Sequence, residues 1–307
     1  MGHPVSYRSG LTRIAVAGVV WGSIPLFSRQ VHTSALVIVF WRVAFAFAAA
    51  AVILLVRRRL TDIQRLTPRQ MLGLCAMGTV LALNWGLFFS ALQLTSVAVA
   101  VLLTYTGPVL VTALSPLVTR EPFDPRALAP LALALAGTVV VVGPAAPGLS
   151  DGTHLLGAVL AFASAFTYSI GVVVAKRLLE GIPAPVYMAG QTLAASVVLL
   201  PAILLLPGPS TAIEWGALAT LGVFHTAAAG ILFLTGLHAV RADHAAILTY
   251  AEPVAAVLFA AIFLAEPLTV PTVTGGAMVV LGGILVARME PSPGIEAPVP
   301  VMDSHDV

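Results

Sequence analysis

The sequence predicts an all-α membrane protein with ten transmembrane helices, arranged as two inverted five-helix repeats. Its composition is the first observation: the 307-residue chain is 59% hydrophobic and only 9% charged. Soluble domains carry roughly 25% charged residues, and the mean hydropathy here is +1.01. So few charges cannot cover a surface that faces water, and we therefore expect the lipid bilayer to surround most of the chain.

An internal repeat is the second observation. Residues 92–142 recur as residues 237–287 without a gap, at a spacing of 145 residues. Tyrosine, proline and glutamate are scarce in this chain, so their repetition carries more information than matches among leucine, alanine and valine. In a membrane chain, such a repeat is typical of a transporter built from two related halves. The matched motifs are Leu103-Thr104-Tyr105-x-x-Pro108-Val109 with Leu248-Thr249-Tyr250-x-x-Pro253-Val254, and Glu121-Pro122 with Glu266-Pro267.

Ten apolar segments form the third observation, since a spanning helix needs about 20 mostly apolar residues. The first repeat is expected over 11–143 and the second over 153–288, followed by a Pro-rich, acidic, disordered cytoplasmic tail at 289–307. The expected spans are 12–29, 35–56, 70–91, 96–118, 126–143, 154–175, 185–206, 213–236, 244–264 and 270–288.

The distribution of Lys and Arg predicts the topology. Of the 15 basic residues, thirteen lie in one set of alternating connections and termini, the other set holds only Arg29, and Arg42 lies within a span. Basic residues favour the cytoplasmic side, so both termini are predicted to be cytoplasmic, in the cytoplasmic (inner) membrane. Five helices in each half then place the second half in the membrane upside down relative to the first.

With these motifs in view, the chain resembles EamA-type members of the drug/metabolite transporter superfamily over residues 11–288. The resemblance implies a ten-helix basket with a central cavity that exports or takes up small organic solutes. Bacterial members of this kind include exporters of amino acids and related metabolites. The residues that carry it are Trp21-Gly22-Ser23, Trp41-Arg42, Tyr105-x-x-Pro108, Tyr250-x-Glu252-Pro253, Glu121 and Glu266.

Two ionisable groups lie deep within predicted spans, where charge is costly and usually functional. Glu252 is the one acid well inside a span, and it stands where the first repeat has Gly107. Burial would favour its neutral form, so it could carry a coupling proton or bind a substrate amine, or it could be a structural carboxyl. Arg42 is the one base well inside a span; it could bind a substrate carboxylate, pair with Glu252, or extend towards the outer headgroups.

Pro108 and Pro253 are interpreted as kinks that act as gate hinges and free the carbonyls of Thr104 and Thr249, with a purely architectural kink as the alternative. His225 is mid-span, either a proton relay or a core imidazole bonded to a carbonyl. The remaining candidate substrate-binding groups are Trp21, Ser23, Asn84, Trp85, Tyr105, Tyr168, Gln191 and Tyr250.

Other features are interpreted as structural. Glu121 and Glu266 are expected to stabilise helix starts, and Gly18-x-x-x-Gly22 is expected to allow close helix contact. Cys75, the single cysteine, is expected to be a small packed hydrophobe.

The predicted function is secondary transport of a small metabolite by alternating access, most simply export of amino acids, with proton coupling through Glu252 or His225. The alternatives are uptake of a metabolite or vitamin, drug efflux, a passive channel and, last, a membrane-embedded enzyme. The sequence contains no nucleotide-binding loop and no metal-ligand spacing. We therefore expect no cofactor, no metal, no nucleic-acid partner and no enzymatic reaction, and a monomer that binds a small-molecule solute.

Overall fold

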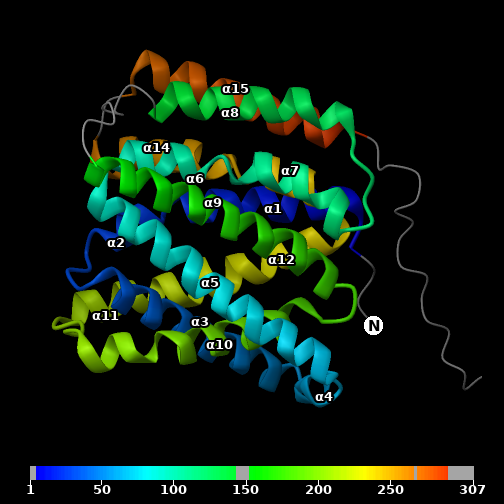
Figure 1. Cartoon of the computed structure of the whole chain (residues 1–307), viewed down its shortest axis with the longest axis vertical. Helices are drawn as coiled ribbons and strands as arrows, with labels where there is room; N and C mark the ends of the chain where they lie inside the picture. Colours follow the sequence, from blue (N-terminus) through cyan, green and yellow to red (C-terminus); the bar gives the residue numbers. More distant parts are fainter. Residues whose placement is uncertain (1–4, 143–151, 266–267, 290–307) are drawn as a thin grey trace, which may run out of the picture.

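The computed structural model describes residues 5–142, 152–265 and 268–289, and within these ranges it contains helices and no strands. The helices run side by side across the molecule (Figure 1). The first half contains α1 (Tyr7–Gly22), α2 (Ile24–Ser28), α3 (Ala35–Val56), α4 (Leu60–Gln64), α5 (Pro68–Leu94), α6 (Val97–Thr104), α7 (Gly107–Val118), η1 (Pro125–Ala127) and α8 (Leu128–Val142). The second half contains α9 (Gly152–Leu178), α10 (Ala184–Leu205), α11 (Ala212–Thr220), η3 (Leu221–Ala228), α12 (Ala229–Ala239), α13 (Ala242–Leu248), α14 (Ala251–Leu264) and α15 (Val270–Arg288).

Nine helical segments of the described chain are long and apolar enough to cross a membrane, one fewer than expected. The difference lies in the predicted fifth span, where the apolar helix over Pro125–Val141 is shorter. Its start is fixed by Asp124, whose side chain accepts a hydrogen bond from the backbone of Arg126 at 3.0 Å, and by Pro125 at the first helical position. The predicted tail beyond residue 289, Glu266 and Pro267 lie outside the described residues.

Helix α1 begins and helix α15 ends at the same face of the molecule, on the right in Figure 1. We call this side the N-terminal face and the other side the opposite face. A common side for both ends agrees with the even number of crossings that the charge pattern predicts. That this face is cytoplasmic stays a prediction.

The matching helices α8 and α15 pack side by side in antiparallel directions (Figure 1). A Cβ atom added to either Gly137 or Gly275 would lie only 2.5 Å from the carbonyl oxygen of the other. Gly282 approaches the carbonyl of Pro130 in the same way, at 2.9 Å. In the sequence repeat, Gly137 matches Gly282 and Pro130 matches Gly275. The two contacts are therefore counterparts: exchanging the two halves turns one into the other.

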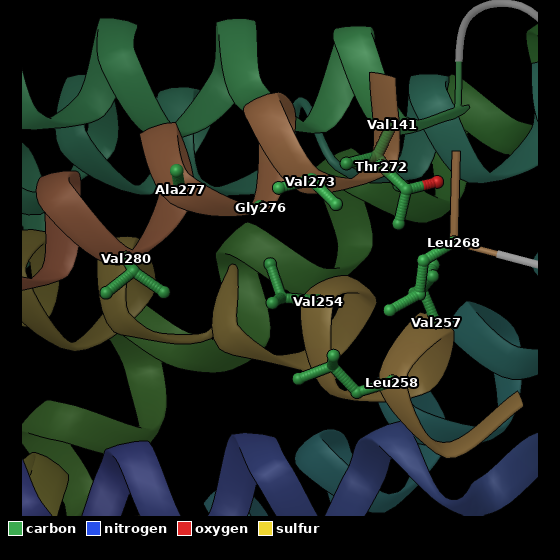
Figure 2. A pocket seen from close by; sticks show the side chains of 10 residues that line it. All are labelled: Val141, Val254, Val257, Leu258, Leu268, Thr272, Val273, Gly276, Ala277 and Val280. Atoms are coloured by element: carbon green, nitrogen blue, oxygen red, sulfur yellow. The ribbon is translucent and has the colours of Figure 1, made fainter. Parts of the chain in front are cut away.

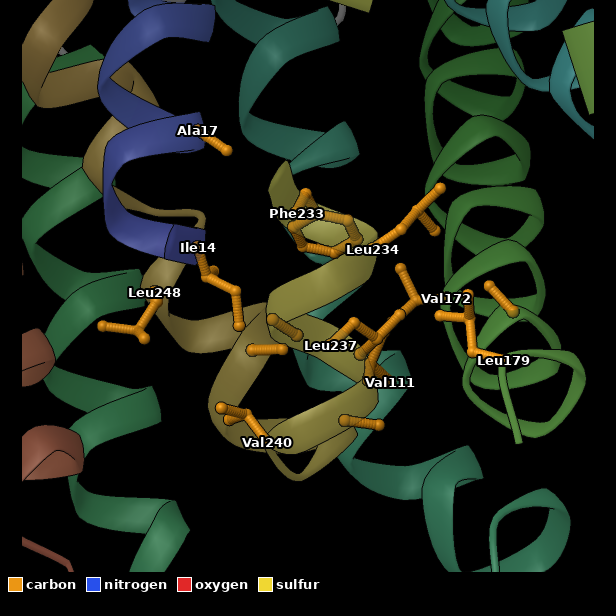
Figure 3. Packing of buried hydrophobic residues seen from close by; sticks show 14 of the residues in the cluster. Ile14, Ala17, Val111, Val172, Leu179, Phe233, Leu234, Leu237, Val240 and Leu248 are labelled. Carbon is orange, nitrogen blue, oxygen red and sulfur yellow. The ribbon is translucent and has the colours of Figure 1, made fainter. Parts of the chain in front are cut away.

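A hydrophobic core joins the two halves near the N-terminal face. Figure 3 shows Ile14 of α1 pointing towards α12 and its Leu237, with Val111 of α7 and Val172 of α9 close to Leu237, while Ala17 lies further along α1. All five residues are buried. This core holds parts of both repeats together beneath the N-terminal face.

Helix α1 also packs tightly on α14, as its glycine spacing predicts. A Cβ atom at Gly22 would lie 2.5 Å from the Cβ atom of Ala255 and 2.8 Å from the carbonyl oxygen of Glu252, while the nearest atom to a Cβ at Gly18 would be Ala251 Cβ at 3.4 Å. Cys75 differs from the prediction: it is exposed on the side of α5 instead of packed in the core.

Candidate functional site

Two broken helices stand at the centre of the candidate site. The spans expected to be kinked at Pro108 and Pro253 are each divided into two helices, α6 with α7 and α13 with α14, and each proline lies at the start of the second helix. The predicted free carbonyl of Thr249 is wrong, because it accepts a hydrogen bond from the backbone N–H of Glu252 at 2.9 Å. The breaks bring turn residues and the N-termini of α7 and α14 into the spans.

Matching tyrosines meet where the two broken helices approach each other. The Tyr250 hydroxyl donates to the carbonyl of Tyr105 at 2.7 Å, and their ring centroids are 6.0 Å apart. The Tyr168 ring packs on Gly107, where an added Cβ would lie 2.7 Å from the ring, and its hydroxyl is 3.4 Å from the Thr249 hydroxyl. Position 107 matches Glu252 in the sequence repeat. Because it is a glycine, the Tyr168 ring can occupy the space that a side chain would fill.

Arg42 is buried inside the bundle instead of extending to the headgroups. Its side chain is on α3, with 6% of the residue exposed, and its guanidinium carbon lies 4.2 Å from the centroid of the Trp85 ring. Nη2 donates to the Thr226 hydroxyl at 3.4 Å, but Nε has no hydrogen-bond partner in the described chain. A buried, delocalised cation with an unsatisfied donor is suited to bind an anionic group.

Glu252 lies in the first turn of α14 and is half-buried. Its carboxylate is close enough to the Arg42 guanidinium for the two charges to attract each other, and its charge also acts on Tyr105 and Tyr168. Within the described residues, however, no ion pair joins Glu252 to Arg42, so the direct bridge considered from the sequence is not present. The two opposite charges therefore act on each other without neutralising each other by contact.

His225 joins the first helix to a stretch of π-helix. Its Nε2 atom is 2.8 Å from the Ser23 hydroxyl, its Nδ1 atom is 3.2 Å from the carbonyl of Thr220, and its own carbonyl accepts a 2.8 Å hydrogen bond from the Trp21 indole. The Phe27 ring packs at 5.2 Å from the imidazole. Trp21 and Ser23 thus meet His225 as neighbours, and the imidazole does contact a carbonyl, one of the two roles expected for it.

Asn84 and Gln191 have other neighbours in the described chain. The Asn84 amide donates to the Ser164 carbonyl at 2.7 Å and to the Ser164 and Thr167 hydroxyls at 3.1 Å each, so it fastens α5 to α9. Gln191 is half-buried on α10, and its backbone carbonyl is the group that faces Gly78 of α5. The contacts of Asn84 are those of a structural hydrogen bond between helices.

The π-helix η3 is a feature that the sequence analysis missed. Its wider turn lets the Thr226 hydroxyl donate to the carbonyl of Leu221, five residues earlier, at 2.9 Å while it accepts from Arg42. Such stretches are rare and often mark functional sites. No residue pattern predicts a π-helix at this stretch. The polar pair His225-Thr226 within an apolar span was the sequence feature that could have drawn attention to it.

A separate apolar groove of about 330 Å³ lies between α14 and α15, beside the end of α8 (Figure 2). Thr272 is the one polar side chain among the ten residues that line it. Several of these residues, such as Val273 and Val280, are exposed at the molecular surface. Neither Arg42 nor Glu252 is among the lining residues.

This architecture is that of a multi-pass α-helical membrane transporter: long apolar helices enclose broken helices and a few uncompensated charges. The EamA-like transporter family model matches this chain twice, over residues 8–143 and 155–288. The chain belongs to the EamA-like transporter family. This membership points to transport and not to an enzyme.

Relatives and solved structures agree with this assignment. An uncharacterized transporter of Archaeoglobus fulgidus is 30% identical over 284 residues, covering 92% of this chain and 97% of the relative. The uncharacterized transporter YxxF of Bacillus subtilis is 23% identical over 260 residues, covering 83% of this chain and 82% of the relative. A crystal structure with 23% sequence identity matches with a TM-score of 0.79 over 92% of this chain and 98% of its own, which shows a shared fold.

Proposed function

We propose that the protein is a secondary transporter of the cytoplasmic membrane that moves amino acids or related zwitterionic metabolites out of the cell by alternating access. The observation that carries the proposal is the pair of opposite charges, Arg42 and Glu252, that lie near each other inside the bundle without an ion pair. A zwitterion offers a carboxylate to the guanidinium and an ammonium group to the carboxylate. Such a substrate would neutralise both charges at once.

The proposed arrangement has ten crossings in two inverted repeats, with both termini in the cytoplasm. The antiparallel packing of α8 on α15, with exchangeable contacts at Gly137 and Gly282, supports an axis that lies in the membrane plane. The η1–α8 segment runs beside α15 and would be the tenth crossing. The hydrogen bond between Tyr250 and its own counterpart Tyr105 would then lie near this axis.

Proton coupling is part of the same proposal. Glu252 would bind a proton when the substrate leaves, because a carboxylate away from water and without an ion-pair partner favours its neutral form. The candidate binding and gating groups around it are Trp21, Ser23, Arg42, Tyr105, Tyr168, His225 and Tyr250, with the helix breaks at Pro108 and Pro253 as hinges.

Substrate competition in proteoliposomes tests the zwitterion proposal. Counterflow of a panel of labelled amino acids is measured, and unlabelled competitors are then added as matched trios: the amino acid, its amide, and the acid that lacks the amino group. We expect only the intact zwitterion to compete strongly. Equal competition by the amide or by the deaminated acid would contradict a role for the corresponding charge, and transport restricted to apolar aromatic compounds would favour drug efflux. Imposed substrate gradients of either direction test whether export is preferred.

A further inference from the structure

We infer that Thr226, on the π-helix η3, positions the Arg42 guanidinium so that its Nε atom is a donor to the substrate carboxylate. The inference deepens the function proposed above and rests on it, because it takes Arg42 as the group that binds the carboxylate. Thr226 is a positioning residue, since it acts through Arg42. The observations that carry the inference are the hydrogen bonds of η3, its packing on α3, and the groups around the guanidinium.

The two polar side chains of η3 both reach carbonyls five residues earlier. The Thr226 hydroxyl donates to the carbonyl of Leu221 at 2.9 Å, and Nδ1 of His225 lies 3.2 Å from the carbonyl of Thr220. In an ordinary α-helix a threonine hydroxyl bonds to the carbonyl four residues earlier, as Thr235 of α12 does at 2.6 Å. These side-chain bonds therefore follow the five-residue spacing of the π-helix.

The bond to Leu221 also fixes what the Thr226 hydroxyl can do for Arg42. A hydroxyl has one hydrogen to donate, whereas a guanidinium can only donate. Because that hydrogen is directed at the Leu221 carbonyl, a lone pair of the Thr226 oxygen is free to accept, and Nη2 of Arg42 donates to it at 3.4 Å. Arg42 and Thr226 are both buried, which limits competition from water.

A glycine seats η3 on α3 at the turn that carries Arg42. A Cβ atom added to Gly222 would lie 2.4 Å from the Cβ atom of Phe45 and 2.8 Å from the carbonyl oxygen of Arg42 itself. Gly222 precedes Thr226 by about one turn of η3. The missing side chain at position 222 lets the two backbones approach, so the short threonine side chain can reach the guanidinium.

Trp85 holds the guanidinium from another element. The guanidinium carbon of Arg42 lies 4.2 Å from the centroid of the Trp85 ring on α5, and such a contact covers one face of the cation. Nη2 is bonded to Thr226, whereas Nε is buried and has no hydrogen-bond partner among the described residues. A buried donor left unpaired costs free energy, and a carboxylate oxygen would satisfy it.

Two fixed contacts give Arg42 a defined orientation. Rotation of the guanidinium would break either the hydrogen bond to Thr226 or the contact with the Trp85 ring. A group that is already held in its binding orientation loses less freedom when the ligand arrives, and this preorganisation increases affinity. Loss of the Thr226 hydroxyl should therefore weaken the binding of carboxylates and leave contacts with the amino group of the substrate unchanged.

Competition in proteoliposomes tests the inference with the matched trio of amino acid, amide and deaminated acid. Thr226→Val keeps the shape of the side chain but removes the acceptor, whereas Thr226→Ser keeps the hydroxyl. Thr235→Val in α12 is the matched control, because the Thr235 hydroxyl bonds within its own helix. The half-inhibitory concentration of each compound is measured for every variant, and gel filtration in detergent checks folding. Thr226→Ala replaces Thr226→Val if the valine variant does not fold.

In the unaltered protein, the amino acid should compete more strongly than its amide. Thr226→Val should raise the half-inhibitory concentration of the amino acid about tenfold, the effect of losing a hydrogen bond to a charged group. The deaminated acid should lose affinity by the same factor, because it carries the same carboxylate. The value for the amide should not change. Thr226→Ser and Thr235→Val should resemble the unaltered protein for all three compounds.

The outcomes separate the inference from the proposed function. An equal loss for all three compounds would mean that Thr226 only stabilises the contact between α3 and η3, and the inference would be wrong. It would also be wrong if Thr226→Val left competition unchanged, or if Thr226→Ser or Thr235→Val showed the same loss as Thr226→Val. If the unaltered protein does not distinguish the amino acid from its amide, the proposed role of Arg42 itself fails.

Discussion

Gly22→Ala should weaken the contact between α1 and α14 and displace Glu252. The new methyl group would lie 2.5 Å from Ala255 Cβ and 2.8 Å from both the Ala256 nitrogen and the Glu252 carbonyl oxygen. Carbon atoms pack best at about 3.5–4.0 Å, so the helices must separate by about 1 Å. Two of the three obstructing atoms are backbone and cannot rotate away. Overpacking of this kind costs about 1–3 kcal/mol.

Thermal and denaturant unfolding of the purified protein in detergent would measure this cost. Gly216→Ala in α11 is the matched control, because no atom lies within 4 Å of its added Cβ. Alanine in an open helical position should stabilise that variant by about 0.5–1 kcal/mol. Equal stability of the two variants would refute the reasoning. Because Glu252 moves with α14, Gly22→Ala should also reduce transport by more than its loss of folded protein.

Three further variants test the proposed site. Glu252→Gln should abolish proton-driven flux in proteoliposomes yet retain counterflow, because the amide cannot release a proton. Glu180→Gln is the control and should preserve both activities. Unchanged proton-driven flux in Glu252→Gln would reject the coupling role. Arg42→Lys should raise the half-saturating substrate concentration at least about tenfold, because the planar fork is lost while the charge remains, and unaltered affinity would place the substrate elsewhere. Asn84→Ala should lower the free energy of unfolding by about 1–3 kcal/mol, because the Ser164 carbonyl loses its 2.7 Å partner. Substrate affinity should not change. A selective change in affinity would show that Asn84 contacts substrate.

Much of the architecture follows from patterns that lie along the chain. Apolar segments about 20 residues long must be helical in lipid because no other local structure satisfies their backbone groups. Gly18 and Gly22 lie on one face of a helix because they are four residues apart, and that spacing predicted the contact with α14. The fifth span, expected over 126–143, is the apolar helix over Pro125–Val141, whose position hydropathy gave closely even though this helix is the shortest of the ten apolar segments of the described chain.

Contacts between distant segments were not predictable. Glu121 was expected to stabilise the helix that follows it, because the sequence shows only neighbours. This expectation is wrong: its carboxylate accepts a 3.0 Å hydrogen bond from the backbone N–H of Ala242, at the start of α13 in the other half. Pro108 and Pro253 indicated distortion, but only the folded chain shows two separate helices and a satisfied Thr249 carbonyl. The π-helical turn that gives Arg42 its Thr226 partner depends on packing between α3 and η3, which no local pattern encodes.

By itself, the sequence determined that the chain belongs in a bilayer, that it is built from two related halves, and that Arg42 and Glu252 are the exceptional charges within its spans. Composition and the spacing of apolar segments suffice for these conclusions, because each residue that faces lipid must itself be apolar. Only the tertiary structure decided that these two charges form no ion pair with each other, and that the Glu121 carboxylate joins the first half to Ala242 in the second. Those facts depend on where helices meet, and pairing across the bundle leaves no trace in local sequence.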